Sequence, residues 1–332
     1  MSPVHSIVTI LFGFALASLL TGCSREPTAT DPVLTKVLTK KDDRWNLPER
    51  SLKYCRLVDE AHASAIQTVE NYLPKTSGQI DDLGLNVADI LSELPGVIDV
   101  AGPKVDSPTQ RIVHLIDHPL PTKDEFLIRL RGKADGGVSF NQLELIYDDY
   151  LQQIELMQAE QMVVLRCLIK HHGLRQVFAE GVTEANLPLY HDKITSLRFP
   201  GACTAEEVRK RRLDLLEFGA VGQLHITGEL PEVLPVDDAD FIVQSVMKRR
   251  LISTIDKNSI DDDKIQPRKP MEALDHKVQM ILNHGKFGFI VGDDYDLTEN
   301  VNRISGGKCE YIRVKTKWWN EISPLDPNVW GR

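Results

Sequence analysis

The chain alternates short runs of β-forming residues with longer helical patterns, and this alternation limits its fold more than any other feature. The five runs, each apolar or β-branched at its centre, are residues 111–117, 175–180, 232–236, 286–292 and 309–315. Strands separated by helices need crossover connections, which give a parallel sheet covered on both faces. We therefore expect an α/β fold of three layers, with a mostly parallel central sheet of about five strands, an N-terminal helical layer and one long helix.

The long helix is predicted at residues 140–172. Apolar residues recur there every three or four positions, as on one face of a helix. Ser139 and Gln142 supply a capping box at its start, and Gly173 supplies a stop at its end. This helix lies between the first and second expected strands, so we expect it to make the first crossover of the sheet.

Composition and periodicity divide the chain into five parts. Helices are expected at residues 51–73 and 86–94, and residues 256–270, with three consecutive aspartates and two prolines, are expected to form a mobile insertion. The predicted parts are a signal peptide (1–22), a flexible tether (23–48), an N-terminal helical segment (49–108), an α/β domain (109–316) and a C-terminal tail (317–332).

Charge and motif content exclude several classes of function. Hydrophobic residues make up 42% of the 332 residues and charged residues 26%, which is typical of a folded globular protein. The net charge of −9 lacks the basic excess that nucleic acid binding requires, so we expect no nucleic acid partner. The patterns GxSxG, GxxxxGK[ST], GxGxxG and HExxH are absent from the sequence, so standard serine-hydrolase, P-loop, dinucleotide and zincin sites are not expected.

The N-terminus predicts export and lipid attachment. Residues 7–20 form an apolar run of the length found in signal peptides, too short for a spanning helix. The segment Leu-Thr-Gly-Cys that ends at Cys23 looks like a bacterial lipoprotein box, in which the cysteine thiol carries the lipid. We therefore expect a membrane-anchored lipoprotein of the bacterial cell envelope, facing the periplasm or the exterior, with palmitate-type chains on Cys23. Because residues 1–6 contain no Lys or Arg, an ordinary signal peptide or an uncleaved anchor stays an alternative.

Four further cysteines bear on the exported compartment. In an oxidising compartment they could form up to two disulfides with three possible pairings, or they could be buried and inert. The sequence leaves these alternatives open for Cys55, Cys167, Cys203 and Cys309.

Acidic residues and one histidine follow the expected strands. Because the carboxyl ends of parallel strands meet at one edge of a sheet, where ligands bind, these side chains are candidates for a common cleft. His118 and Glu180 are candidate catalytic residues, and with Asp293 and Asp294 they form a candidate metal-ligand set. Asp117 and Tyr295 are candidate ligand-binding residues. Helix capping is the stronger interpretation for other acids at these ends, namely Asp237, Asp238 and Asp296.

Several segments of the α/β domain resemble a known superfamily. They are VHLIDHPLPTKDEF, KHHGLRQVFAEGVTE, GAVGQLHITGELPEVLPVDD and FGFIVGDDYDLTENV. Together they look like uncharacterised bacterial proteins distantly similar to the TIKI superfamily, which includes erythromycin-esterase-like, TraB-like and ChaN-like haem-binding proteins. The resemblance covers roughly residues 110–316 and rests on short motifs.

This resemblance implies roles for particular residues. His118 matches the early histidine of the family, Glu180 its strand-end glutamate, and residues 292–296 its late Gly-x-x-His segment. Leu115 stands where the early motif has glycine, and Tyr295 stands where the late histidine is expected. The missing imidazole weakens the case for the metallohydrolase activity that some relatives imply. A tyrosine, however, can ligate haem iron.

Three functions remain open from the sequence. The first is a ligand-binding lipoprotein that holds haem or a divalent metal in the cleft, with Tyr295 and His118 as candidate haem ligands. The second is a metal-dependent hydrolase of esters or amides, in which a bound cation activates water. The third is a non-catalytic scaffold that acts through a protein partner, whose identity the sequence does not give.

Overall fold

The computed structural model describes residues 47–118, 140–198, 205–240 and 271–322, with residues 120, 121, 123, 124 and 126 between them. The predicted signal peptide, nearly all of the tether, the insertion at 256–270 and most of the C-terminal tail lie outside these residues, and so does Cys23. Within the described part of the chain, no helix is both long and apolar enough to cross a membrane.

The described residues form one six-stranded sheet in the order β1-β6-β2-β5-β3-β4. Its strands are β1 (Val97–Ala101), β2 (Gln110–Asp117), β3 (Gln176–Ala179), β4 (Glu232–Pro235), β5 (Phe287–Asp293) and β6 (Cys309–Thr316). The strands from β6 to β4 run parallel, and β1 pairs antiparallel with β6 at one edge. The predicted α/β fold with a mostly parallel sheet is therefore confirmed.

The edge strand β1 was not predicted. It lies in the segment that we expected to be helical, between Pro95-Gly96 and Gly102-Pro103. Its five residues include Asp99 and are mostly exposed, so the apolar alternation that marks a strand is weak. The partner decides its conformation, because pairing with β6 satisfies its backbone hydrogen bonds along one side.

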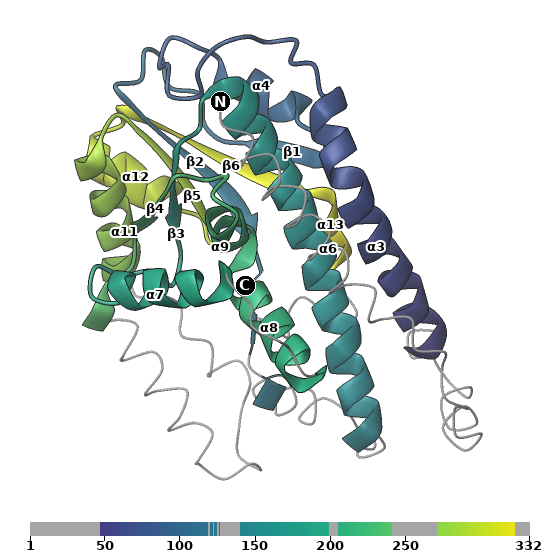
Figure 1. Ribbon diagram of the computed structural model, residues 1–332. Coiled ribbons are helices and arrows are strands. Elements are labelled where there is room, and N and C mark those ends of the chain that lie inside the picture. Colours follow the sequence, from purple (N-terminus) through teal and green to yellow (C-terminus); the bar gives the residue numbers. More distant parts are fainter. Residues whose placement is uncertain are drawn as a thin grey trace, which may run out of the picture.

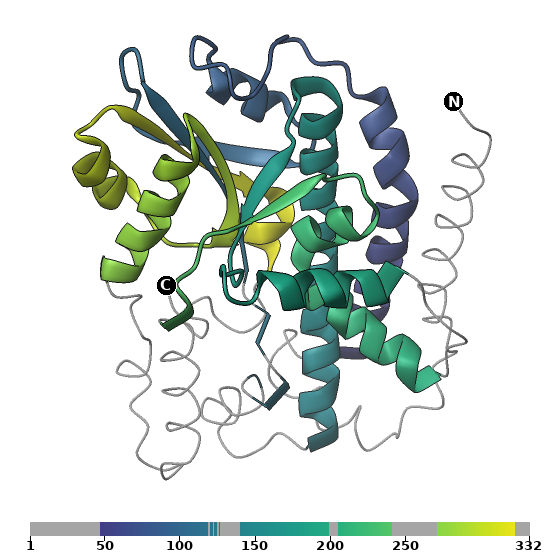
Figure 2. The ribbon, with the colours of Figure 1, turned by 60° about the vertical axis from the view of Figure 1, so that its left-hand side comes forward.

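Helices cover both faces of the sheet (Figures 1 and 2). They are α3 (Leu47–Asn71), α4 (Val87–Glu93), α6 (Phe140–His172), α7 (Leu187–Arg198), α8 (Ala205–Glu217), α9 (Gly219–Ile226), α11 (Met271–His284), α12 (Thr298–Ser305) and α13 (Lys317–Glu321). Helices α4, α6 and α9 share one hydrophobic core with the sheet, and α3 packs along α6. Helices α11 and α12 share a second core with the opposite face. The bounds of α6 match the predicted long helix.

Helix α6 is longer than the strands it covers. Its 33 residues span about 50 Å at 1.5 Å per residue, whereas the eight residues of β2 span about 26 Å. The excess length projects past the carboxyl ends of the strands. There its residues Tyr150 and Ile154 pack with Phe126, Leu216 and Trp319 in a separate core. The carboxyl edge of the sheet is therefore bordered by packed side chains and not by bulk solvent alone.

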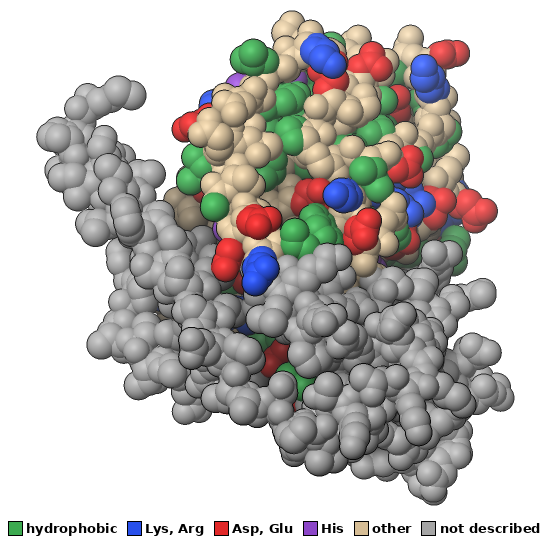
Figure 3. Space-filling model, turned by 90° about the vertical axis from the view of Figure 1, so that its right-hand side faces the viewer, with side chains coloured by type: hydrophobic (Ala, Val, Ile, Leu, Met, Phe, Trp, Pro, Cys, Tyr) green, Lys and Arg blue, Asp and Glu red, His purple; other side chains and the backbone are tan. Residues whose placement is uncertain are grey.

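The outer surface of α3 is mixed in character. Figure 3 shows the side of the molecule that carries α3, and charged side chains of both signs are interspersed there with hydrophobic ones. Two large apolar side chains are exposed here, Ile66 on α3 and Leu73 just after its end. Such scattered apolar residues are ordinary on a folded protein and do not by themselves mark a binding surface.

Two of the cysteines are now placed. Cys167 on α6 and Cys309 at the start of β6 are buried free thiols. Burial raises the pKa of the Cys167 thiol to about 11 and that of the Cys309 thiol to about 12, so both are poor nucleophiles. These two thiols are therefore unpaired, whereas Cys203 and the side chain of Cys55 lie outside what the structure describes.

Candidate functional site

The carboxyl end of β5 lies where the topology of the sheet favours a ligand. β5 pairs with β2 on one side and with β3 on the other. The chain leaves β2 and β3 toward the face covered by α6 and α9, but it leaves β5 toward α12 on the opposite face. Where neighbouring connections leave on opposite faces, their loops part and a ligand can approach the strand ends. The residues at these ends are the predicted ones: Asp117, His118, Glu180, Asp293, Asp294 and Tyr295.

Asp117 ends β2 on the face covered by α6. It is the register partner of Asp293 in the parallel pairing of β2 with β5. Its Oδ1 accepts hydrogen bonds from the backbone N–H of His118 at 2.8 Å and from Gln161 Nε2 at 3.3 Å. Burial, with a smaller contribution from the charge of Asp293, raises the pKa of the Asp117 carboxyl to about 7 despite these hydrogen bonds. A carboxyl group that titrates near neutral pH is typical of functional sites.

His118 lies against helix α13, which itself packs on α6. Its ring stacks on Trp319 with 5.1 Å between ring centroids and 15° between ring planes. Its Nε2 lies 3.3 Å from the carbonyl oxygen of Trp319, which requires the proton to be on Nε2. Burial lowers the pKa of His118, although the Trp319 carbonyl and the charges of Asp293 and Asp294 oppose that shift. His118 is therefore a neutral imidazole at pH 7.

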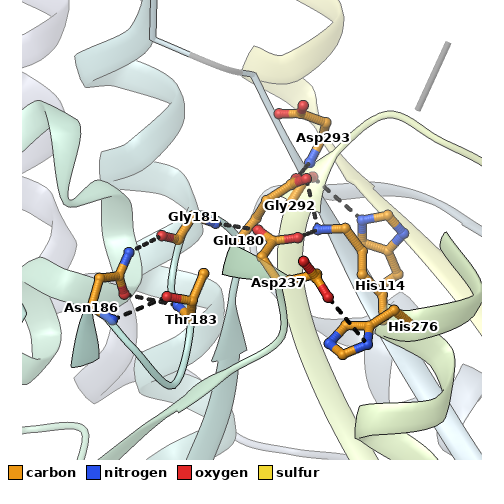
Figure 4. A network of polar contacts seen from close by, with 11 residues as sticks. His114, Glu180, Gly181, Thr183, Asn186, Asp237, His276, Gly292 and Asp293 are labelled. Carbon is orange, nitrogen blue, oxygen red and sulfur yellow. Dashed lines mark hydrogen bonds and ion pairs between the residues drawn. The ribbon is translucent and has the colours of Figure 1, made fainter. Parts of the chain in front are cut away.

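Glu180 is held by a buried lysine that sequence reasoning missed. Lys277 of α11 is 1% exposed, and its Nζ lies 2.9 Å from Glu180 Oε1 and also pairs with Asp237 Oδ1. The other oxygen of Glu180 accepts the backbone N–H of Asp293 at 2.6 Å, and the other oxygen of Asp237 accepts the backbone N–H of Gly181 at 2.6 Å. Figure 4 shows this network of carboxylates and backbone groups at the ends of β3 and β5. Lys277 thereby ties α11 to the ends of three strands.

Gly292, the last residue but one of β5, has no side chain, and this leaves room for the carboxylate of Glu180 and the ring of Tyr295. A Cβ atom at Gly292 would lie 2.7 Å from Glu180 Oε2 and 3.1 Å from Tyr295 Oη. Tyr295 packs in the core of the α11 face, with its ring 5.4 Å from Lys277 Nζ and 5.0 Å from the ring of His114. Burial raises the pKa of Tyr295 well above its ordinary value, so its phenol keeps its proton.

His114 is a packed structural residue. It is fully buried inside β2, with Nε2 3.3 Å from the carbonyl oxygen of Gly292 and Nδ1 2.8 Å from Tyr311 Oη. The carbonyl oxygen can only accept a hydrogen bond, so the ring proton is on Nε2. Nδ1 is then free to accept a hydrogen bond from the Tyr311 hydroxyl. The imidazole therefore links β2, β5 and β6 just beneath the carboxyl edge.

The proposed metal ligands already have partners in the protein. Both oxygens of Glu180 accept hydrogen bonds, Asp294 pairs with Arg313, and the protonated Nε2 of His118 faces a carbonyl oxygen. Among the described residues, no three His, Cys, Asp or Glu side chains are grouped as a metal ion would need. The ammonium of Lys277 lies between Glu180 and Asp237, the place that a cation would otherwise take. A metal would have to break several of these contacts in order to bind.

The two haem ligands suggested by the sequence, Tyr295 and His118, contact different sets of residues. Tyr295 contacts His114 and Lys277 on the α11 face, whereas His118 stacks on Trp319. An axial tyrosine must ionise to bind iron, and burial opposes that ionisation here. The residues present do not form a ready haem site.

The capping interpretation holds for one acid and not for another. Asp296 Oδ1 accepts the backbone N–H and the hydroxyl of Thr298 at 2.9 and 2.6 Å, so it stabilises the start of α12. Asp237 instead binds Lys277 and Gly181, which makes it part of the site. Asp238 faces His276, with 4.0 Å between Oδ2 and Nδ1.

Two of the missed residues left a signal in the sequence. Lys277 lies four residues from both Ala273 and Ile281, on the buried stripe of α11. Gln161 likewise lies among the buried residues of α6. A polar residue inside an apolar stripe predicts a buried partner, but it does not say which residue that partner is.

Comparison with known proteins gives no match that bears on this site. The chain matches no protein-family model, no curated protein and no solved structure. The resemblance to the TIKI superfamily therefore stays a hypothesis.

Proposed function

We propose that this protein is a lipid-anchored protein of the bacterial cell envelope that binds a small ligand at the carboxyl edge between β2, β5 and β3. The observation that carries this proposal is the convergence of Asp117, His118, Glu180 and Asp293 at the strand ends where the loops part. A carboxyl group with a raised pKa, such as that of Asp117, is typical of binding and catalytic sites when it lies at such an edge.

The contacts of the edge favour an organic ligand over a metal ion. The carboxylate oxygens that a metal would need as ligands already bind Lys277, Arg313 and a backbone N–H group. Among the described residues of this edge, acidic side chains outnumber basic ones. The acids are Asp117, Glu180, Asp237, Asp293 and Asp294, and the bases are Lys277, Arg313 and Lys315. A neutral or positively charged ligand fits this charge better than an anion does.

Ligand binding can be tested with the full-length protein purified from membranes. Bound metal and haem are measured by elemental analysis and absorption, and a library of small polar molecules is screened by thermal shift. Ligands found in this way are then tested against Asp117→Asn and Glu180→Gln, with the exposed Asp99→Asn as a matched control. Loss of binding in the first two variants alone supports the edge site, and equal binding in all three refutes it.

The envelope anchor rests on the N-terminal sequence and has its own test. Cells that express the protein are labelled with palmitate, and the membrane fraction is examined. Incorporation that disappears in Cys23→Ser supports lipidation of Cys23. Label that persists in this variant contradicts it.

Hydrolysis of an ester or amide is a second candidate, favoured by the raised pKa of Asp117. A carboxyl group with a pKa of about 7 can exchange a proton with a reacting group near neutral pH. Turnover of a panel of simple esters should then depend on one ionisation near that pH and be lost in Asp117→Asn. Turnover that is unchanged in this variant removes the proposed role. If no ligand binds and no ester turns over, the scaffold function becomes the better explanation.

A further inference from the structure

One oxygen of Asp117 is left open in the structure. Both hydrogen bonds to this carboxylate go to Oδ1. Within the described part of the chain, no donor is paired with Oδ2. Gly219, the first residue of α9, lies on that side, and a Cβ atom there would be 3.6 Å from Oδ2.

Gln161, which donates a hydrogen bond to the same carboxylate, presents a second acceptor without a donor. Its side-chain nitrogen Nε2 donates to the carbonyl oxygen of Ile116 at 3.1 Å and to Asp117 Oδ1 at 3.3 Å. Because both partners are acceptors, they fix which end of the carboxamide is nitrogen. The oxygen Oε1 is then buried without any hydrogen-bond partner, on a side chain that is 0% exposed. A buried acceptor without a donor is costly, and an absent water, ion or ligand donor is one explanation for such an atom.

Among the residues that the structure describes, no charged group supplies a donor to Asp117 Oδ2. The charged group that acts on Asp117 from the neighbouring strand is Asp293, which is itself acidic. Gln161 from α6 and Gly219 from α9 carry no charge, and the adjacent His118 is a neutral imidazole at pH 7. Two acceptors next to an uncompensated carboxylate therefore call for a positively charged hydrogen-bond donor.

We propose that Asp117 Oδ2 and Gln161 Oε1 bind the ammonium group of a small primary amine. A primary ammonium carries one positive charge and three N–H donors, which matches one carboxylate oxygen and one amide oxygen. The assignment rests on the proposed function, since it names the ligand class of the same edge. A Cβ atom at Gly219 would make an ordinary van der Waals contact with Oδ2, and it is the φ of +62° that favours glycine there.

The proposal fixes the direction of a pH dependence. An ammonium favours the ionised form of Asp117, whose pKa burial raises to about 7 in the free protein. Binding therefore releases a proton and becomes tighter as pH rises. From the ionised fraction of one such carboxyl, the affinity should increase about tenfold between about pH 6 and pH 8.

The experiment titrates the full-length protein with n-butylammonium chloride in a calorimeter at these two pH values. Tetramethylammonium has the same charge but no N–H donor, so it serves as the ligand control. We expect binding of n-butylammonium alone, tighter at the higher pH and with proton release that is seen by comparing two buffers. Asp117→Asn and Gln161→Met should each weaken binding at least tenfold, whereas Asp99→Asn should not.

Several outcomes would overturn the inference. They are equal binding of the two cations, binding that weakens as pH rises, and unchanged affinity in either edge variant. The proton release of the unmodified protein keeps the test valid even if a variant fails to fold. If another ligand binds at the edge and no amine does, this inference fails and the proposed function stands. If nothing binds there, both fail.

Discussion

The buried ammonium of Lys277 offers the sharpest test of how the carboxyl edge is stabilised. The change Lys277→Met keeps most of the side-chain volume and removes the charge. It leaves Glu180 and Asp237, whose side chains are 17% and 8% exposed, without their shared cation. Each carboxylate keeps one backbone N–H donor, from Asp293 and Gly181 respectively.

The expected loss of stability follows from these contacts. Removing one partner of a buried ion pair costs about 3–5 kcal/mol, because the remaining charge stays desolvated. The two backbone donors offset part of this cost, so we expect about 3 kcal/mol at neutral pH. In the variant, burial and mutual repulsion should raise the pKa of both carboxyl groups above their unfolded values. The penalty is then largest at pH 7 and shrinks as pH falls toward 4, where both groups are protonated.

Urea denaturation of the unmodified protein and the variant at both pH values measures this difference. Lys286→Met is the matched control, since Lys286 is exposed just before β5. The double variant Lys277→Met/Asp237→Asn should regain part of the lost stability, because it removes one of the two stranded charges. A loss below about 1 kcal/mol that does not change with pH would refute the idea that Lys277 compensates buried charge.

Three further predictions concern the same edge and the sheet beneath it. Gly292→Ala should lower the free energy of unfolding by about 1–3 kcal/mol because its Cβ would approach a carboxylate oxygen at 2.7 Å, whereas Gly285→Ala, with no atom within 4 Å of the new Cβ, should change little. Arg111→Met should cost about 3 kcal/mol in urea denaturation, since the buried guanidinium pairs with a carboxylate at 2.5 Å and donates to three backbone carbonyls of residues 82–85. Asp117→Asn should stabilise the fold at pH 8 by up to a few kcal/mol and have little effect near pH 4, because a carboxyl whose pKa is raised to about 7 by folding costs stability once it ionises.

Each of these has a clear contrary result. Equal effects of the two glycine substitutions would mean that the close approach at β5 is relieved without cost. A small effect of the arginine substitution would mean that the loop at residues 82–85 does not depend on β2. A stability difference for Asp117→Asn that is independent of pH would mean that this carboxyl titrates in its ordinary range.

The candidate site was only partly accessible to sequence reasoning. The strand ends could be read from the sequence, because an acid after an apolar run is a local pattern. Asp117, His118, Glu180 and Asp293 were selected in that way, and the structure places them along one edge. The role of Asp237 was misjudged as capping, because its true partner Lys277 lies 40 residues away in the chain and on a different element.

The sequence by itself determined the α/β class, the five parallel strands, the bounds of α6 and the edge at which acids gather. These features follow from hydrophobic periodicity and from the short reach of turn and capping signals, all of which are local. Only the tertiary structure decided that β1 joins the sheet, that Lys277 lies between two carboxylates and that Gln161 lies against Asp117. The physical reason is that strand order and helix packing bring together side chains far apart in the chain, and a local pattern carries no record of which partner each buried polar group will find.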